Sequence, residues 1–268
     1  MTDGSRLPPF PVWADGRLHP AGSFVVSADD SAYRSGLGCY TSALVRGGDV
    51  RHLDRHIARL RRAAKALGFA VPSDTAVREA FRGLARAAFD GRDGAIRMQL
   101  SRDASGTRLV GIPRALGNDP VRWRAITSPI AHPGPSRFPG QKLTNRVEIE
   151  GAAEAAQAEG VEEALLFDRQ GRLVEGTRSN LVLEDGQGHW LTPPAERGGV
   201  AGLALEILRE RSAIHERDLG PRDLASARGV CVTNAVRGAR ALGALDGTPL
   251  PAGGDALAAR LADLLDRV

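Results

Sequence analysis

The sequence predicts an α+β protein of two lobes, because its short strands and helices lack the strict strand–helix alternation of a doubly wound sheet. A chain of 268 residues is long enough for two lobes that each have a core. Hydrophobic periodicity is lost and turn residues gather between about residues 112 and 120. We therefore expect a smaller N-terminal α/β lobe over 1–113, a linker over 114–120 and a larger C-terminal α/β lobe over 121–268.

The first lobe is predicted from turn signals and helical spacing. Asp15-Gly16 and Gly47-Gly48 each separate two short extended pieces, as in β-hairpins. Apolar residues recur at helical spacing from about Asp54 to Leu67, before a glycine that can end a helix. A second helix is expected from Ser73 or Asp74 to Phe89, and a strand over 94–102.

The second lobe is expected to open with a strand over 121–130. A Pro/Gly-rich loop then leads to a helix over about 145–159, which Gly160 ends. The remaining pattern predicts further strands and helices, read from these segments: "EEALLFD", "GRLVEG", "NLVLED", "HWLTP", "GVCVTNAV" and "ARALGALDG" as strands, "GLALEILRER" and "DALAARLADLLDRV" as helices.

Composition narrows the class of protein. The net charge is +4, but the arginines are mixed with acids and no nucleic-acid module is recognisable, so we expect no nucleic acid partner. No apolar run reaches about 18 residues, so we expect no membrane association and a cytoplasmic location. Cys39 and Cys231 stand in apolar surroundings, which predicts buried thiols. The scattered histidines predict no metal site.

Lysine is rare in this chain: of the 36 basic residues only Lys65 and Lys142 are lysines. A guanidinium stays protonated at any working pH, so arginine can replace lysine as a charge but not as an amine that forms an imine. Lys65 follows an arginine-rich helical pattern and is interpreted as a solvated charge. Lys142 follows Pro139 and Gly140 in a loop, where it is either a surface charge or a reactive amine.

Two other features allow both a structural and a functional interpretation. Glu175 precedes small hydroxyl residues between two apolar strands, so it is either a surface turn residue or a carboxylate beside a flat ligand. Gly198, Gly199 and Gly202 precede a predicted helix, whose N-terminal N–H groups can bind an anion; glycines also simply mark turns. An amine, a carboxylate and an anion cup together are what pyridoxal phosphate requires.

Four motifs carry a resemblance to a known family: "DDSAYRSGLGCYTSALV", "HLDRHIARLRRAAKALG", "GQKLTNR" and "EEALLFDRQGRLVEGTRSNLVL". In order and spacing they resemble the class IV aminotransferases, the fold-type IV pyridoxal phosphate enzymes. That family includes branched-chain and D-amino-acid aminotransferases and aminodeoxychorismate lyase. The resemblance covers nearly the whole chain. It implies two α/β lobes as in D-amino-acid aminotransferase, with the cofactor between them, and a homodimer acting on a small molecule.

The resemblance also implies roles for matching residues. Lys142 is expected to be the Schiff-base lysine, Glu175 the partner of the pyridine nitrogen and Arg59 the clamp on the phosphate. Further cofactor contacts are implied for a set of residues in the matching segments: Asn145, Thr177, Asn180, Gly202, Leu203, Thr233, Asn234 and Ala235.

Two stretches indicate which reaction the chain performs. "GCYTSALV" is similar to the lyase pattern, whereas aminotransferases carry a glutamate where this chain has Thr41. Thr233-Asn234-Ala235 likewise resembles the lyases. Both favour aminodeoxychorismate lyase, which eliminates pyruvate to leave 4-aminobenzoate for folate synthesis. Thr41 is the second catalytic candidate after Lys142, and Arg102 and Tyr40 are candidates for substrate binding; Arg102 is equally well interpreted as a solvated strand-end charge.

Departures from the family pattern keep alternatives open. Leu37 replaces an acid between two glycines, Asp103 replaces a glycine and Leu205 replaces an arginine. These positions bear on the substrate more than on the cofactor. The main alternative is a class IV aminotransferase acting on branched-chain or D-amino acids or another amine donor. A Schiff-base enzyme or binding protein without a cofactor is an alternative from a different class.

Overall fold

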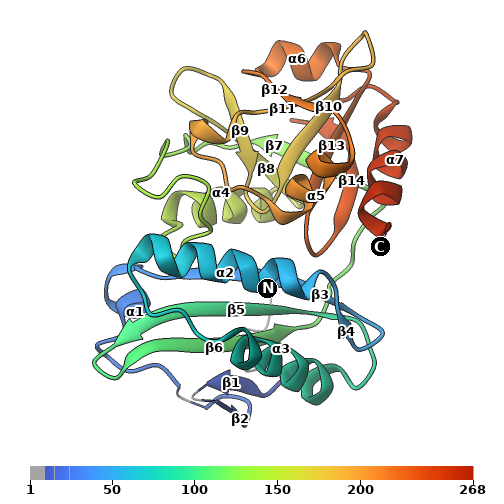
Figure 1. Cartoon of the computed structure of the whole chain (residues 1–268). Coiled ribbons are helices and arrows are strands. Elements are labelled where there is room, and N and C mark those ends of the chain that lie inside the picture. Colours follow the sequence, from blue (N-terminus) through green and yellow to red (C-terminus); the bar gives the residue numbers. More distant parts are fainter. Residues whose placement is uncertain (1–9, 15, 24, 268) are drawn as a thin grey trace. The chain divides into compact units, whose positions relative to one another are not determined.

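The computed structural model describes residues 10–14, 16–23 and 25–267 (Figure 1). Contacts divide the chain into two compact units. The first comprises Met1–Asn118 and Lys142–Asn145, and the second comprises Asp119–Gln141 and Arg146–Val268. Lys142 is therefore grouped with the first unit, although the segments on both sides belong to the second. As folding domains, the expected lobe boundaries remain a prediction.

The first unit is an antiparallel sheet of six strands in the order β2-β1-β6-β5-β3-β4. Its strands and helices have these bounds: β1 Val12–Ala14, β2 Arg17–His19, β3 Cys39–Arg46, β4 Asp49–Val50, β5 Gly94–Asp103, β6 Gly106–Arg114, α1 Ser31–Ser35, α2 Leu53–Leu67 and α3 Asp74–Phe89. The two long helices bury their apolar faces against β3 and β5. Leu60 of α2, Phe81 of α3 and Met98 of β5 are buried in one core, and each such side chain contributes about 1.5–3 kcal/mol.

The second unit is a mixed sheet in the order β12-β11-β10-β13-β14-β7-β8-β9, with β15 paired to β14. The elements have these bounds: β7 Arg122–Thr127, α4 Val147–Ala158, β8 Glu163–Phe167, β9 Leu173–Gly176, β10 Asn180–Glu184, β11 Trp190–Thr192, η1 Ala195–Arg197, α5 Leu203–Arg211, β12 Ile214–Glu216, α6 Pro221–Ser226, β13 Gly229–Asn234, β14 Gly238–Leu245, β15 Thr248–Pro249 and α7 Gly254–Asp266. Helices α5 and α7 share a core with β10 and β13.

Most predicted elements are confirmed, and local chemistry explains their ends. Helix α2 stops at Gly68, whose φ of +68° favours glycine, and Ser73 caps α3 by accepting the Ala76 N–H at 3.1 Å. The strands around the predicted turn at Asp15 pair as a hairpin, although Asp15 itself lies outside the described residues. Six elements were not predicted: α1, β6, η1, β12, α6 and β15. All of them except β6 are too short to show a period.

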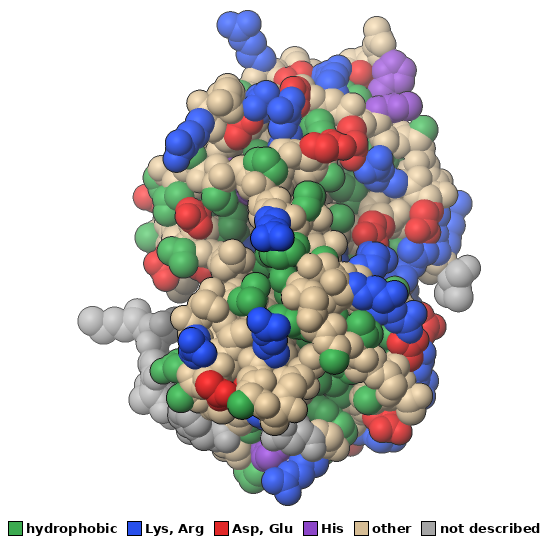
Figure 2. Space-filling model, turned by 60° about the vertical axis from the view of Figure 1, so that its left-hand side comes forward, with side chains coloured by type: hydrophobic (Ala, Val, Ile, Leu, Met, Phe, Trp, Pro, Cys, Tyr) green, Lys and Arg blue, Asp and Glu red, His purple; other side chains and the backbone are tan. Residues whose placement is uncertain are grey.

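The cysteines, the surface charges and the helix lengths can be compared with what the composition predicted. Both cysteines are free and buried, as predicted, and burial raises the pKa of Cys39 to about 12. On the face shown in Figure 2, basic and acidic side chains are interspersed. Of the helices within the described ranges, none is both long and apolar enough to cross a bilayer.

Candidate active site

Lys142 is held at the start of strand β3 by its own backbone. Its carbonyl accepts the Tyr40 N–H at 3.0 Å, and Leu143 forms an isolated bridge with Cys39. Two residues earlier, Gly140 has a φ of +71°, and its carbonyl accepts the Ala201 N–H at 3.0 Å. Backbone hydrogen bonds therefore hold this loop at Gly140 and at Lys142. The lysine side chain is half-buried.

Tyr40 provides an aromatic surface for Lys142. The lysine Nζ lies 5.1 Å from the centroid of the Tyr40 ring, and the Arg97 guanidinium carbon lies 3.6 Å from it. Cations are attracted to the face of such a ring. The structure thus brings together two of the predicted residues, Lys142 and Tyr40, and adds Arg97, which sequence reasoning did not select. Asn145 is exposed and lies against the turn at Gly36.

Thr41 points to the opposite face of β3, because side chains alternate along a strand. It is completely buried, and its Oγ1 lies 2.6 Å from Nδ1 of His56 on α2. Burial, together with the charges of Arg59 and His52, lowers the pKa of His56 to about 3. His56 is therefore neutral at physiological pH, and its Nε2 has no hydrogen-bond partner among the described residues.

The two predicted arginines of the first unit differ in burial. Arg59 lies three residues beyond His56 on α2 and is only 7% exposed, so its guanidinium is largely withdrawn from water. Arg102 is exposed at the end of β5, with its guanidinium carbon 5.7 Å from the centroid of the Phe69 ring. Its geometry is that of a strand-end cation resting on an aromatic ring.

In the second unit Glu175 is a buried carboxylate on β9, only 4% exposed. Its Oε2 accepts the Val200 N–H at 2.8 Å. Its Oε1 lies 3.7 Å from Nε2 of His132. The alternative interpretation of Glu175 as a surface turn residue is therefore wrong: strand β9 and the glycine-containing segment before α5 enclose this side chain.

The residues expected to form an anion cup lie where β10, β13 and α5 meet. Asn180 and Thr233 are direct partners on neighbouring antiparallel strands. Asn180 Nδ2 donates to the Val200 carbonyl at 2.9 Å, and a Cβ on Gly202 would lie 1.7 Å from Asn180 Oδ1. Gly202 is the N-cap of α5 and offers no side-chain cap, so the N–H groups from Leu203 onward are not satisfied by a cap.

Thr233 contributes an unsatisfied polar atom to this region. The residue is 1% exposed, and its Oγ1 has no hydrogen-bond partner among the described residues. Buried hydroxyl groups normally have partners. Asn234 uses its Oδ1 to accept the Val236 and Arg237 N–H groups at 2.9 and 2.8 Å, which shapes the turn that contains Ala235. The cup thus combines an uncapped helix start with an unpaired hydroxyl, which suits a phosphate group.

Sequence reasoning missed Glu163, the first residue of β8. It is fully buried, and its carboxylate accepts hydrogen bonds from the Thr177 N–H at 2.8 Å, the Ser179 hydroxyl at 2.6 Å and the Ala164 N–H at 3.0 Å. The Thr177 hydroxyl and the Arg178 N–H also donate to it. The predicted cofactor residue Thr177 therefore uses its hydroxyl to bind Glu163. An acid beginning an apolar strand was the available signal.

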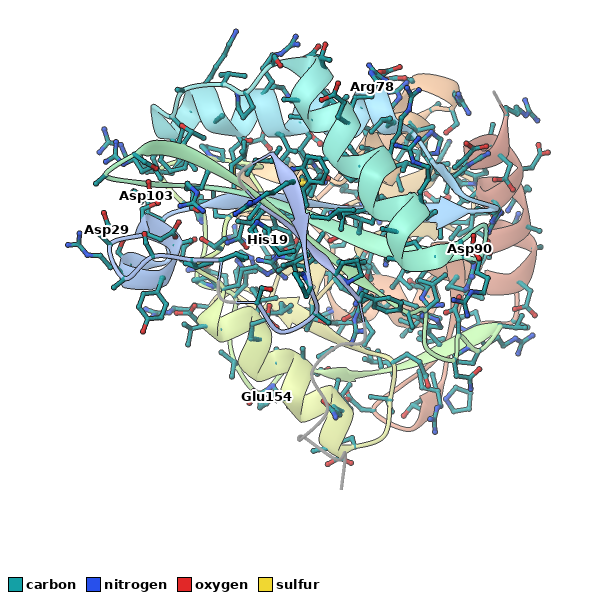
Figure 3. The ribbon with its side chains drawn as sticks, turned by 90° about the horizontal axis from the view of Figure 1, so that it is seen from below. His19, Asp29, Arg78, Asp90, Asp103 and Glu154 are labelled. Carbon is teal, nitrogen blue, oxygen red and sulfur yellow. The ribbon has the colours of Figure 1, made fainter. Side chains whose placement is uncertain are left out.

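The departures from the family pattern have local roles. Asp103 accepts hydrogen bonds from Ser105 and Arg108 at the β5–β6 turn, and these lower the pKa of Asp103 to about 2. Figure 3 shows Asp29 and Asp103 at the same end of the first unit, where the Ser27 hydroxyl contacts both. Leu37 packs on the first core and Leu205 lies in the core of α5 and α7.

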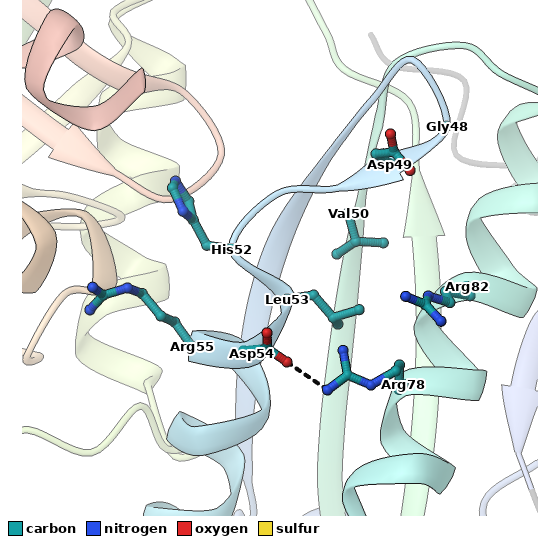
Figure 4. Close-up of a pocket in the computed structure, with 9 residues that line it drawn as sticks. All are labelled: Gly48, Asp49, Val50, His52, Leu53, Asp54, Arg55, Arg78 and Arg82. Carbon is teal, nitrogen blue, oxygen red and sulfur yellow. Dashed lines mark hydrogen bonds and ion pairs between the residues drawn. The ribbon is translucent and has the colours of Figure 1, made fainter. Parts of the chain in front are cut away.

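A cavity is found in each unit, and of these two only the cavity of the second unit is lined by predicted site residues. A cavity of about 480 Å³ opens at the start of α2, and the Asp54–Arg78 ion pair crosses it (Figure 4). None of the predicted site residues lines it. In the second unit a cavity of about 60 Å³ is lined by residues that include Asn180, Val200 and Gly202. No cluster of potential metal ligands occurs within the described ranges.

Comparison with known proteins shows which family the sequence of this chain matches. The model of the family described as amino-transferase class IV matches residues 38–244. A Schizosaccharomyces pombe protein provisionally named aminodeoxychorismate lyase is 28% identical over 176 residues, which cover 65% of this chain and 74% of that protein.

Solved structures show the same fold. The 4-amino-4-deoxychorismate lyase from Pseudomonas aeruginosa is 28% identical, with a TM-score of 0.82 over 95% of this chain and 97% of the lyase. The branched-chain aminotransferase from Thermoproteus uzoniensis is 22% identical, with a TM-score of 0.85 over 96% of this chain and 94% of that one. The expected fold-type IV architecture is confirmed.

Replacing Glu163 with glutamine tests its role in the turn between β9 and β10. The amide NH₂ would face at least one backbone N–H, which can only donate, and a Thr177 or Ser179 hydroxyl would have to reverse its hydrogen bond, so we expect Glu163→Gln to lower the free energy of unfolding by about 1–3 kcal/mol. Glu154→Gln, on an exposed position of α4, is the control and should change it by less than about 0.5 kcal/mol. Urea unfolding measures both. Equal stability of the two variants would contradict the role of Glu163.

The pKa of His56 predicts a pH dependence of stability. The folded protein keeps this ring neutral down to about pH 3, whereas the unfolded chain protonates it below about 6.5. His56 therefore supports stability above pH 6.5, and between pH 8 and pH 5 its contribution falls by about 2 kcal/mol. In urea unfolding at several pH values, His56→Asn should show a correspondingly flatter profile. The exposed His215→Asn control should keep the wild-type slope.

Proposed function

The chain belongs to the class IV aminotransferases, and from this premise we propose that it is a lyase that uses pyridoxal phosphate to release pyruvate from 4-amino-4-deoxychorismate, leaving 4-aminobenzoate. The observation that carries the choice of a lyase is Thr41. Aminotransferases of the family carry a glutamate at this position, and here a neutral hydroxyl meets a neutral imidazole. A buried carboxylate at the same place would need a cation or several donors.

The residues of the second unit fit the cofactor. The unpaired Thr233 hydroxyl and the uncapped start of α5 at Gly202 and Leu203 would hold the phosphate group. Glu175, buried and acting only as an acceptor when ionised, would face the pyridine nitrogen. Asn180 closes the cup by tying Val200 to β10.

The residues of the first unit supply the amine and a cation. We assign Lys142 as the residue that attaches the cofactor and Arg59 as a second phosphate ligand, because its guanidinium can bind an anion through two parallel hydrogen bonds. We also include four residues among the proposed cofactor contacts, because they shape the backbone around Lys142, Glu175 and the phosphate cup: Asn145, Thr177, Asn234 and Ala235. Tyr40 and Arg102 are proposed to contact the substrate.

Pyridoxal phosphate, when bound, supplies a carbonyl for the substrate amine and an electron sink. The protein supplies the proton transfers. Lys142 Nζ is the general base and acid, and the Tyr40 ring with its stacked Arg97 limits where that amine can point. Thr41, the second candidate, is proposed to act through its hydrogen bond with His56 Nδ1, 2.6 Å away, and not by direct contact with the substrate, because its side chain is completely buried on the face of β3 opposite Tyr40.

The proposed product, 4-aminobenzoate, suggests the pathway in which the enzyme acts. Since 4-aminobenzoate is a precursor in folate synthesis, we place the enzyme in that pathway, in the cytoplasm. As in the family it resembles, we propose that it acts as a homodimer.

Two assays distinguish a lyase from an aminotransferase. With 4-amino-4-deoxychorismate the protein should release pyruvate and 4-aminobenzoate in equal amounts, measured by coupled lactate dehydrogenase and by fluorescence. With branched-chain or D-amino acids and a keto acid it should exchange no amino group. Amino exchange without pyruvate release would refute the proposed reaction in favour of an aminotransferase.

Lysine replacement tests the attachment site. Lys142→Ala should lose at least a thousandfold in activity and the absorbance of the bound cofactor, because alanine has no amine. Lys65→Ala is the matched control, since Lys65 is exposed on α2 and is the other lysine of the chain. Borohydride reduction followed by peptide mass spectrometry should place the cofactor on Lys142. Modification of Lys65 instead would overturn the assignment.

A further inference from the structure

His132 is a buried histidine that the proposed reaction does not yet use. It lies in the loop that follows β7, and the residue is 5% exposed. Its backbone N–H donates to the Phe167 carbonyl of β8 at 2.8 Å, so the loop is anchored beside the strand that pairs with β9. Buried ring nitrogens normally have polar partners, so the surroundings of both nitrogens of His132 indicate what the ring does.

The hydrogen bonds of the ring determine which nitrogen carries the proton. The Gly134 N–H donates to His132 Nδ1 at 3.0 Å. A backbone N–H can only donate, so Nδ1 accepts and the proton of the neutral ring is on Nε2. That nitrogen lies 3.7 Å from Glu175 Oε1. The fixed N–H dipole of His132 thus faces the carboxylate, at a distance slightly longer than a direct hydrogen bond.

The two oxygens of Glu175 have different partners. Oε2 accepts the Val200 N–H at 2.8 Å, whereas Oε1 faces the imidazole. Gly198 packs against the same histidine: a Cβ there would lie 2.9 Å from His132 Cε1 and 2.5 Å from the Gly134 carbonyl oxygen. With its φ of +108°, this position favours glycine. The glycine-containing segment therefore encloses the His132–Glu175 pair and supplies its second donor.

We propose that His132 is a positioning residue, whose Nε2–H fixes the orientation of the Glu175 carboxylate toward the pyridine nitrogen of the cofactor. This inference rests on the proposed function, in which Glu175 is the partner of that nitrogen. The Val200 N–H binds one oxygen and the imidazole N–H faces the other at 3.7 Å, so one orientation of the carboxylate is favoured. Partners of this kind typically change ligand affinity or activity by about 10- to 100-fold when removed.

Two variants separate the contacts of the ring. In His132→Asn the side-chain oxygen can replace Nδ1 and accept the Gly134 N–H, but the group that faces Glu175 is lost. In His132→Gln the longer amide can replace the Nε2–H that faces Glu175. A purely structural role would make the two variants similar, whereas a positioning role predicts that only glutamine rescues.

The experiment uses full-length protein loaded with ¹⁵N-labelled pyridoxal phosphate. Wild type and His132→Gln should give the ¹⁵N chemical shift of a protonated pyridine nitrogen, and His132→Asn should move it toward the unprotonated value. Titration of the apoprotein should show about tenfold weaker cofactor binding for His132→Asn. Thermal melting of each apoprotein identifies any loss of folding, and Glu175→Gln provides the reference for a missing carboxylate.

The outcomes of this experiment are distinct. If wild type binds the cofactor and Glu175→Gln shifts the ¹⁵N signal while both His132 variants match wild type, the role of His132 is refuted and the proposed function stands. Equal ¹⁵N shifts away from wild type in both His132 variants would also refute it, because glutamine would then fail to rescue. If wild-type protein binds no pyridoxal phosphate, the proposed function itself fails.

Discussion

A carboxylate can be buried only where several donors replace the water it loses, and Glu163 meets this requirement with five donors. Four of the five come from one turn, Thr177 to Ser179. A Cβ on Gly176 would lie 2.8 Å from the Glu163 carboxyl carbon, so the chain wraps closely around the acid. The turn therefore has one well-determined conformation, because any other would leave a buried carboxyl group without hydrogen-bond partners.

This turn fixes the relative positions of Glu175 and Asn180, which lie at its two ends. Glu175 lies one residue before the end of β9, which pairs with β8, and Asn180 begins β10, which pairs with β13 beside Thr233. Val200 then connects the two, since its N–H binds Glu175 and its carbonyl binds Asn180. The buried carboxyl group of Glu163 thus positions both Glu175 and Asn180, two of the residues proposed to bind the cofactor.

The sequence predicted the long elements well because their periodicity is local. Helices α2 and α3 and the strands of the second unit follow directly from apolar spacing and glycine stops. The scarcity of lysine singled out Lys142, and the turn residues after Glu175 suggested a ligand site. Glu163, His132 and the partner of Thr41 could not be predicted, because each contacts a residue that is 14 to 43 positions away in the sequence.

Thr41 shows how the chemistry of a position depends on what surrounds it. Its partner His56 is kept neutral by burial and by the positive charge of Arg59 on the same helix. Arg59 is also the residue proposed to bind phosphate, so one cation would serve the cofactor and, second to burial, help to keep His56 neutral. With no proton on Nδ1 the ring accepts from the Thr41 hydroxyl, and with the proton there it donates to it. Because Nε2 has no hydrogen-bond partner among the described residues, the Thr41 hydroxyl is the group that satisfies this buried ring, and either tautomer keeps that hydrogen bond.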